Sequence, residues 1–527
     1  MSEQVLQQIQ KNYEEQRFSC NLPRPIVRYR KDVRTELFEC KYHANELHLR
    51  ASNSLSAAYA LSLASVSARA GYLGEWVGKW QASYSLRPIL LHGDQALRLP
   101  SGGLCSIPHH LLSVLENKES LLNWVTRLVS FGYNAVLFAM DPTSQIEPIT
   151  ASFQSFMKQL QEYGLSIGVQ PVLLDEPMEP QLRRLLRDLP SIDFIYWPHA
   201  MDAALGLTAL QRREWTQCDT ALWYAQQIER LLPAQTRMIF SLLAKDEAEA
   251  LQQSYWITDL GNQLDPSSIL AFPALSGPYE QSHLPLHPYW YCLQRATVPL
   301  GIPLLPIANA GGIGLGEGYW PVLTTQLVNS IVPRMRRHRF CGLGVLASGL
   351  PRKDGFAAAN LWVWGGVQWR PISGEHLAEA WFDGLRPDLN IQQHQVTLRY
   401  AWEAVRVLSE LKSDTRQKEV FAAIERILPW VSQVNKQADL VPKGEEGWVG
   451  QSTMTDYLRF YVRDLRHLID AALDSLRLPS PFPVSESNSL AGIWTAPEKN
   501  IIRPAKQPRF DADDPRMTLV FHENRVI

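Results

Sequence analysis

Short, nearly continuous apolar runs recur along the middle of the chain, and each is separated from the next by enough residues for a helix. The runs lie at residues 87–92, 133–140, 166–174, 193–199, 237–244, 268–276, 302–309 and 342–348. Helical patterns fill several intervals, at residues 121–131, 153–163, 181–189, 221–232 and 322–337. Continuous apolar strands that alternate with helices predict a parallel sheet covered on both faces. Eight such units predict an α/β fold, a (β/α)8 TIM barrel, with an open doubly wound sheet as the alternative.

The segments on either side of this array have different patterns. Residues 46–51 alternate polar and apolar side chains, as a half-buried strand does, and a helix with Ser54 as its N-cap is predicted over residues 53–72. Apolar residues at helical spacing occur at 396–411, 417–431 and 453–476, and a Pro- and Ser-rich stretch begins at Pro479 and ends in an expected strand at 517–521. We therefore predict a small α/β domain (1–84), a catalytic-type barrel (85–385), a helical C-terminal region (386–478) and a tail (479–527).

Charge and cysteine usage narrow the class of protein. The chain has 527 residues with 51 Lys and Arg against 53 Asp and Glu, so it lacks the positive field that non-specific nucleic-acid binding requires. Six scattered cysteines with no C-x-x-C pair predict reduced thiols and no zinc or iron–sulfur site. The polar N-terminus lacks a signal-peptide pattern, and prolines interrupt the longest uncharged stretch. We expect a cytoplasmic protein with no metal, cofactor, nucleic-acid partner or membrane span.

Tryptophan is unusually frequent, with 17 Trp beside 17 Phe. Trp fills large cores, and its flat face also stacks against sugars. Trp124 and Trp381 fall within helical patterns and are interpreted as core residues. Trp197, Trp320 and Trp364 fall at or near predicted strand ends, so the core and sugar-binding interpretations both stay open for them.

In a TIM barrel the active site lies at the carboxyl ends of the strands. Four carboxylates follow predicted strands and are our catalytic candidates: Glu176, Asp202, Glu280 and Glu317. Glycoside hydrolysis needs two carboxyl groups and aromatic faces for the sugar. Strand-end carboxylates also cap helices. A capping role suits Glu176 better than Glu280, because Glu280 lies in the otherwise uncharged segment SGPYEQ.

The same rim carries basic and aromatic side chains that suit a sugar. The substrate-binding candidates are Trp197, His199, Lys245, Tyr279, Trp320, Arg352 and Trp364. The expected partner is a small molecule or an oligosaccharide, and a homodimer is left open.

Residues 268–382 resemble glycoside hydrolase family 67, the α-glucuronidases. ANLW at 359–362 and WRP at 369–371, followed by Ser373, Glu375, Ala378 and Trp381, resemble the family's A-N-L-Y-x-F-G-R-L-A-W-x-P stretch and the helix that follows it. The segment SGPYEQ resembles the family's strand end N-G-P-x-D-F-Q. The resemblance is distant, and the small domain at 1–84 extends it to hexosaminidase-type barrel families.

The resemblance implies an inverting glycosidase with a general acid after the fourth strand and a base-side carboxylate pair after later strands. Glu280 takes the place of the aspartate in that pair, and Glu317 is the candidate second member. Met201 stands at the position of the family's acid, or Asp202 with a shift of one residue, and Trp197 replaces a basic residue. This departure supports a second hypothesis, a carbohydrate-binding or scaffold barrel without catalysis. A barrel enzyme of another class is the third.

Overall fold

The fold was analysed in a computed structural model of the chain. It describes residues 2–20, 22–29, 36–43, 45–71, 78–93, 95–107, 111, 117–140, 148–150, 153–172, 178–189, 191–198, 217–242, 256–274, 289–290, 293, 300–309, 328–329, 331–336, 339–347, 356–370, 372–385, 422, 425–426, 428–429 and 432. The predicted helical region at 386–478 lies almost entirely outside these residues, and the tail at 479–527 lies wholly outside them.

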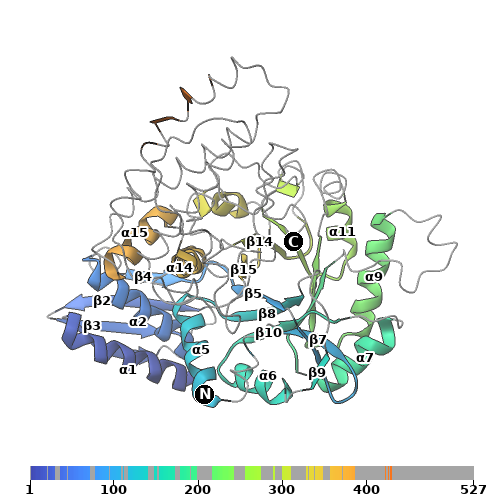
Figure 1. Ribbon diagram of the computed structural model, residues 1–527, viewed down its shortest axis with the longest axis horizontal. Coiled ribbons are helices and arrows are strands. Elements are labelled where there is room, and N and C mark those ends of the chain that lie inside the picture. Colours follow the sequence, from blue (N-terminus) through green and yellow to red (C-terminus); the bar gives the residue numbers. More distant parts are fainter. Residues whose placement is uncertain are drawn as a thin grey trace, which may run out of the picture.

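The first part of the chain forms a small mixed α/β domain. Its elements are α1 (Ser2–Cys20), β1 (Arg24–Tyr29), β2 (Leu37–His43), β3 (Glu46–Ala51), α2 (Ser54–Arg69) and β4 (Gly78–Gln81). The sheet order is β1-β3-β2-β4, with β1 and β3 parallel and the other pairs antiparallel. Helix α2 packs on β2 and β3, while α1 packs on α2 (Figure 1).

The predicted start of α2 is corrected by one residue. Its N-cap is Asn53 and not Ser54, because the side chain of Asn53 accepts a hydrogen bond from the Ser56 N–H at 2.7 Å. The helix ends at Arg69, slightly earlier than the sequence pattern predicts. The strand predicted at 46–51 is confirmed as β3.

All eight predicted barrel strands are present and form a closed parallel barrel. They are β5 (Pro88–Gly93), β8 (Ala135–Met140), β10 (Ser166–Val169), β11 (Phe194–Pro198), β12 (Arg237–Ser241), β13 (Ile269–Pro273), β14 (Leu304–Asn309) and β15 (Gly344–Ala347). The pairing of β15 with β5 closes the ring, with Val345 opposite Ile89. The TIM barrel is therefore confirmed, and the open doubly wound sheet is excluded.

Alternate residues of the strands fill the barrel interior with one apolar cluster. Leu90, Leu137, Phe194 and Ile239 belong to it and are buried. Gly168 leaves room for this packing, because a Cβ atom there would lie 2.3 Å from the Leu137 side chain. The barrel is thus a packed core and not a pore.

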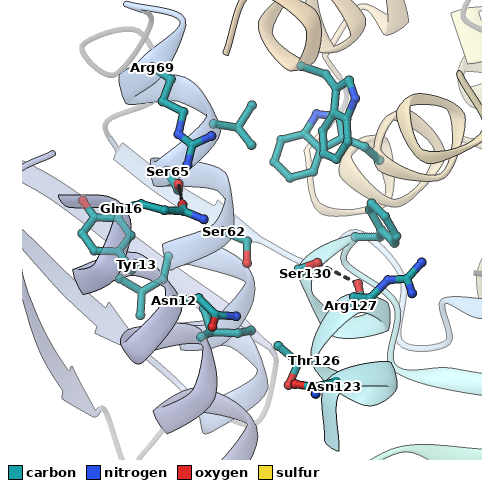
Figure 2. Close-up of a pocket in the computed structure, with 16 residues that line it drawn as sticks. Asn12, Tyr13, Gln16, Ser62, Ser65, Arg69, Asn123, Thr126, Arg127 and Ser130 are labelled. Carbon is teal, nitrogen blue, oxygen red and sulfur yellow. Dashed lines mark hydrogen bonds between the residues drawn. The ribbon is translucent and has the colours of Figure 1, made fainter. Parts of the chain in front are cut away.

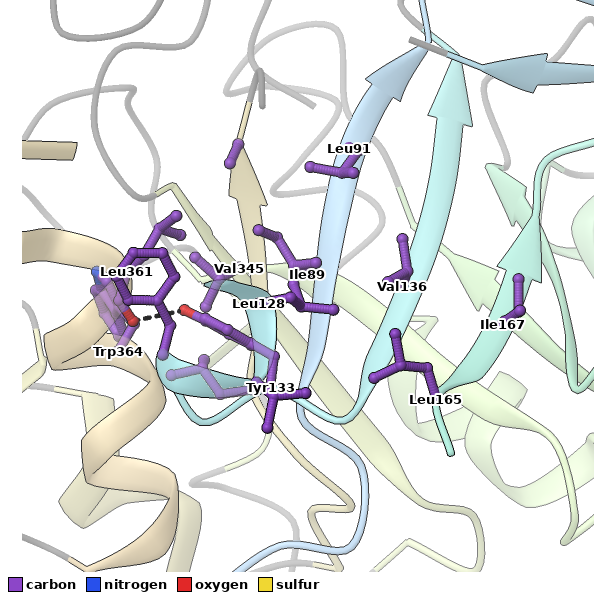
Figure 3. Close-up of a cluster of buried hydrophobic side chains, with 14 of the residues drawn as sticks. Ile89, Leu91, Leu128, Tyr133, Val136, Leu165, Ile167, Val345, Leu361 and Trp364 are labelled. Carbon is purple, nitrogen blue, oxygen red and sulfur yellow. Dashed lines mark hydrogen bonds between the residues drawn. The ribbon is translucent and has the colours of Figure 1, made fainter. Parts of the chain in front are cut away.

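Helices cover the outside of the barrel. They are α5 (Lys118–Ser130), α6 (Phe153–Glu162), α7 (Met178–Asp188), α9 (Gln217–Leu231), α11 (Ile257–Gln263), the 3-10 helix η1 (Val332–Arg336) and α14 (Phe356–Trp369). The last helix, α15 (Gly374–Leu385), packs on α14 and on α2 of the small domain. Figure 3 shows the packed layer between the strands and α14, where the Tyr133 hydroxyl donates a 2.9 Å hydrogen bond to the carbonyl of Leu361. The other face of α14 approaches the small domain, since Trp369 stacks on Tyr59 of α2.

A small three-stranded sheet lies outside the barrel ring. It has the order β7-β6-β9, from β6 (Gln95–Arg98), β7 (Leu104–Ile107) and β9 (Pro148–Thr150). Within the described part of the chain, no helix combines the length and the apolar character that crossing a bilayer requires.

Candidate active site

The carboxyl ends of the eight strands gather at one end of the barrel, because every pair in the ring is parallel. Active sites of TIM barrels are built at this end. We call this end the barrel mouth and define it by the last residues of the strands: Gly93, Met140, Val169, Pro198, Ser241, Pro273, Asn309 and Ala347.

Of the predicted site residues, the structure describes only Trp197 and Trp364. The predicted site residues that lie outside the described residues are Glu176, His199, Asp202, Lys245, Tyr279, Glu280, Glu317, Trp320 and Arg352. Their roles remain predictions. What the structure establishes is the strand that precedes each of them in the chain, namely β10 to β15.

The order of these strands divides the carboxylate candidates into two groups. Strands β10 and β11 are neighbours in the ring, and Glu176 and Asp202 follow them in the sequence. Strands β13 and β14 are also neighbours, and Glu280 and Glu317 follow them. Strand β12 separates the two pairs. The candidates for the acid therefore follow one pair of neighbouring strands in the sequence, and the candidates for the base follow another pair.

Trp197 lies at the mouth end of β11, but its ring faces away from the barrel interior. The ring stacks on Tyr224 of helix α9, with centroids 6.5 Å apart and an interplanar angle of 23°. The side chain is only 2% exposed. Its partner in this structure is a helix of the outer layer.

Trp364 lies in the middle of α14. The sequence predicts this residue at or near the end of a barrel strand, so that prediction is corrected. Its side chain is completely buried, and its backbone carbonyl accepts a 3.2 Å hydrogen bond from the Gln368 side chain. A ring with no exposed face offers no surface to a sugar. The residues expected in the core, Trp124 and Trp381, are both buried as predicted.

The structure adds polar groups at the mouth end of the barrel that the sequence interpretation missed. Tyr196 and Ser241 lie on the adjacent strands β11 and β12, and both are buried. Tyr196 belongs to the interior cluster, and the alternation of side chains along β12 places Ser241 on the same face as Ile239. Gln170, just after β10, is also buried.

Burial raises the pKa of the Tyr196 phenol to about 12, and the nearby hydroxyl of Ser241 opposes that rise. Tyr196 therefore stays protonated at neutral pH and acts as a neutral donor or acceptor, not as a base. The signal for these residues was available in the sequence, because a two-residue period puts Tyr196 on the same face as Phe194.

Comparisons with known proteins bear on the fold. No protein-family model matches the chain, and no curated protein matches it. A family 89 glycoside hydrolase from Clostridium perfringens, solved with 2-acetamido-1,2-dideoxynojirimycin, is similar with a TM-score of 0.51 and 9% identity over 90% of this chain and 62% of the other.

Two further glycosidase structures are similar at lower scores. A GH138 enzyme targeting pectin rhamnogalacturonan II gives a TM-score of 0.49 and 10% identity over 86% of this chain and 66% of the other. A GH20 exo-β-N-acetylglucosaminidase from Vibrio harveyi gives 0.39 and 10% identity over 73% of each chain. The chain thus spans less than two thirds of the GH89 structure and about two thirds of the GH138 structure. It has a closed barrel similar in fold to that of the family 89 glycoside hydrolase.

Proposed function

We propose that the protein is a glycoside hydrolase that cleaves a glycosidic bond of an oligosaccharide or glycoside in the cytoplasm. The observation that carries the proposal is the strand order of the closed barrel, because in the sequence Glu176 and Asp202 follow the neighbouring strands β10 and β11, and Glu280 and Glu317 follow the neighbouring strands β13 and β14. A glycosidase needs an acid and a base on opposite sides of the scissile bond. Similarity in fold supports this reading, although a fold by itself hosts many chemistries.

Each carboxylate has a defined role in the proposed reaction. Asp202, or Glu176 in its place, donates a proton to the departing glycosidic oxygen. Glu280, together with Glu317, takes a proton from the attacking water. An inverting enzyme holds its two carboxyl groups roughly 6.5–9.5 Å apart so that the water fits between them, as the resemblance to α-glucuronidases implies.

A carbohydrate-binding barrel without catalysis is the second candidate. Met201 favours it, because this residue stands where the resembled family has its general acid. Such a barrel keeps the rim that recognises the sugar and loses the proton donor, so it binds a glycoside without turnover.

A screen of nitrophenyl glycosides with the full-length protein separates the two candidates. The hydrolase proposal expects release of nitrophenol from at least one glycoside, and loss of that release in Glu280→Gln. Turnover of none of the glycosides, with saturable binding of a sugar by calorimetry, would establish the binding function in its place. Equal turnover by wild type and Glu280→Gln would remove Glu280 from the mechanism.

A further inference from the structure

The four-stranded sheet of the small domain has one buried face and one exposed face, because side chains alternate between the two faces along each strand. On β3, Leu47 and Leu49 are fully buried, whereas Arg50 is exposed. Helix α2 covers the buried face, and α1 packs on α2, where the Ser65 hydroxyl donates a 3.0 Å hydrogen bond to the Gln16 side chain (Figure 2). Both helices therefore lie on one side of the sheet. We call the opposite side the outer face.

Strand pairing places the side chains of the outer face in rows that cross the sheet. Arg28 of β1 lies opposite Arg50 of β3, and the same row continues to Glu39 of β2 and Lys79 of β4. The residues of the outer face that are not buried are Arg24, Ile26, Arg28, Glu39, Lys41, His43, Glu46, His48, Arg50, Lys79 and Gln81. Five of them are Arg or Lys and two are Glu, so this face is basic although the net charge of the chain is −2.

Both glutamates of the outer face already have partners. Lys41 Nζ lies 3.4 Å from Glu39 Oε1, and His48 Nε2 lies 3.2 Å from Glu46 Oε2. The remaining cations are exposed and have no side-chain hydrogen bond or ion pair within the described part of the chain: Arg24, Arg28, Arg50 and Lys79. The outer face therefore carries an excess of positive charge that the described fold does not neutralise.

Two of these cations are placed directly against each other. Arg28 and Arg50 are paired residues on neighbouring strands, whose backbones lie about 4.8 Å apart. Like charges that face each other across a strand pair destabilise a sheet. An anion between the two guanidinium groups lowers this repulsion, and a guanidinium forms forked, charge-assisted hydrogen bonds with carboxylates and similar oxyanions. The pair is therefore better suited to a bound anion than to an empty surface.

The other side chains of the outer face narrow the class of polyanion. Single-stranded nucleic acids bind where bases stack on aromatic rings, and no Phe, Tyr or Trp is among the outer-face residues defined above. Half-buried Ile26 is the only apolar side chain among them, so little could insert into a membrane. A polysaccharide has rigid rings, and it loses less conformational entropy on a flat surface than a flexible polypeptide does.

We propose that the outer face binds an acidic polysaccharide, with one anionic group of the sugar chain between Arg28 and Arg50 and neighbouring anionic groups at Arg24 and Lys79. The choice of a sugar polymer rests on the proposed function of the barrel. The preference for an acidic polymer rests on the charges of this face alone. No residue of the outer face is a mouth residue, so the polymer is held at a second site on the small domain.

The first test is calorimetric titration of the full-length protein with dextran, carboxymethyl dextran and dextran sulfate, which share one backbone. At least one of the two acidic polymers is expected to bind about tenfold or more tighter than dextran. The tighter of the two identifies carboxylate or sulfate as the preferred group, and its affinity is expected to fall as the salt concentration rises. Absence of saturable binding by both acidic polymers, or binding of dextran as tight as theirs, would overturn the proposal.

Three other polyanions test the assignment to a sugar. Polyglutamate, oligo-dT and vesicles of phosphatidylserine with phosphatidylcholine present anions on a peptide, a nucleic acid and a lipid surface. At equal concentrations of anionic groups, each is expected to bind about tenfold or more weaker than the tighter acidic dextran. Equal or tighter binding of any of the three would rule out a polysaccharide as the preferred partner.

Two double variants localise the binding. Arg28→Gln with Arg50→Gln removes two charges from the outer face and is expected to weaken binding of the tighter acidic dextran about tenfold or more. Lys158→Gln with Arg183→Gln is the matched control, because it removes two exposed positive charges from α6 and α7. The control is expected to bind like the wild type. Wild-type affinity in the first variant, or the same loss in both, would show that the outer face is not the site.

Folding and hydrolysis are measured separately from binding. The variant of Arg28 and Arg50 is expected to unfold at or above the wild-type temperature without polymer, because it removes a like-charge pair. If it fails to fold, the comparison of the three dextrans with the wild type still decides the proposal. Turnover of a nitrophenyl glycoside without binding of either acidic dextran contradicts this inference alone, whereas binding without turnover of any glycoside contradicts only the hydrolase function.

Discussion

Arg87 and Trp369 donate hydrogen bonds to the same acceptor, the carbonyl oxygen of Gly132, at 2.9 Å and 3.1 Å. The Arg87 guanidinium also lies over the Trp369 ring, with its Cζ atom 4.4 Å from the centroid. It donates further to the carbonyl of Tyr84 and forms an ion pair with Glu36. Arg87 therefore joins the small domain, the first barrel strand and α14 while its side chain is only 1% exposed.

Replacing this buried guanidinium is expected to destabilise the fold. Arg87→Lys keeps the charge but loses the planar fork and the stacking on Trp369, so the free energy of unfolding should fall by about 3 kcal/mol. Arg183→Lys is the control, because its ion pair with Glu179 is exposed and should change stability by no more than about 0.5 kcal/mol. Urea denaturation followed by circular dichroism measures both. Equal midpoints for the two variants would contradict the proposed role of Arg87.

The close approach of α14 to the end of α5 depends on a glycine. A Cβ atom on Gly365 would lie 1.8 Å from the backbone carbonyl oxygen of Phe131, whereas one on Gly366 would lie 3.3 Å from the side chain of Leu377. Gly365→Ala is expected to lower the free energy of unfolding by about 3 kcal/mol, since backbone atoms must move apart. Gly366→Ala should be much milder, because helix propensity favours alanine.

The neighbouring pair makes a matched comparison in thermal unfolding. The account expects a large drop in melting temperature for Gly365→Ala alone. Similar melting temperatures for the two variants would show that the helices are not packed as closely as described.

Asp193 predicts a specific dependence of stability on pH. Burial raises the pKa of its carboxyl group above the usual 3.8, although the Ile167 N–H donates to it at 2.8 Å. The folded state therefore binds the proton more tightly than the unfolded state. This contribution to stability is present below the unfolded pKa and is lost as the pH rises through the folded pKa. Asp193→Asn should therefore gain stability relative to wild type as the pH rises above about 4.

Asp265 supplies a control of opposite sign. Hydrogen bonds from Ser267 lower its pKa, so its contribution is present above the unfolded pKa and is lost as the pH falls through the folded pKa. Asp265→Asn should lose stability relative to wild type as the pH rises from the folded pKa of Asp265 to about 4, and its difference from wild type should stay constant in the higher pH range where Asp193→Asn gains stability. Urea midpoints measured from pH 3 to pH 7 test both variants, and parallel curves for all three proteins would contradict the assignment for Asp193.

The barrel was predictable because its strands are buried on both faces and read as continuous apolar runs. The small strands β6, β7 and β9 were not predicted, since segments of three or four mixed residues have no clear period. Closure of the ring depends on the pairing of β15 with β5, which lie far apart in the sequence, and no local pattern encodes it. Asn53 and Ser54 are both good N-cap residues, so only the backbone geometry decides between them.

The candidate site was predictable only as a set of positions after strands. The direction in which each strand side chain points was harder to predict. A parallel strand carries apolar residues on both faces, so its sequence does not indicate which face points into the barrel. Trp197 shows this: its place at the end of β11 is as expected, yet its ring packs on α9. Trp364 shows a second limit. The sequence predicts it at or near a strand end, whereas it lies inside the buried helix α14 that follows the last strand.

The central claim is that Glu280 acts on a glycosidic bond at the barrel mouth. The most direct measurement is kcat/KM on the best nitrophenyl glycoside for Glu280→Gln and for Glu162→Gln. Glu162 is an exposed carboxylate at the end of α6, just before β10 begins and so at the opposite end of the barrel. The account predicts a loss of about a hundredfold or more for Glu280→Gln and wild-type kcat/KM for Glu162→Gln. Wild-type kcat/KM in both variants would contradict it.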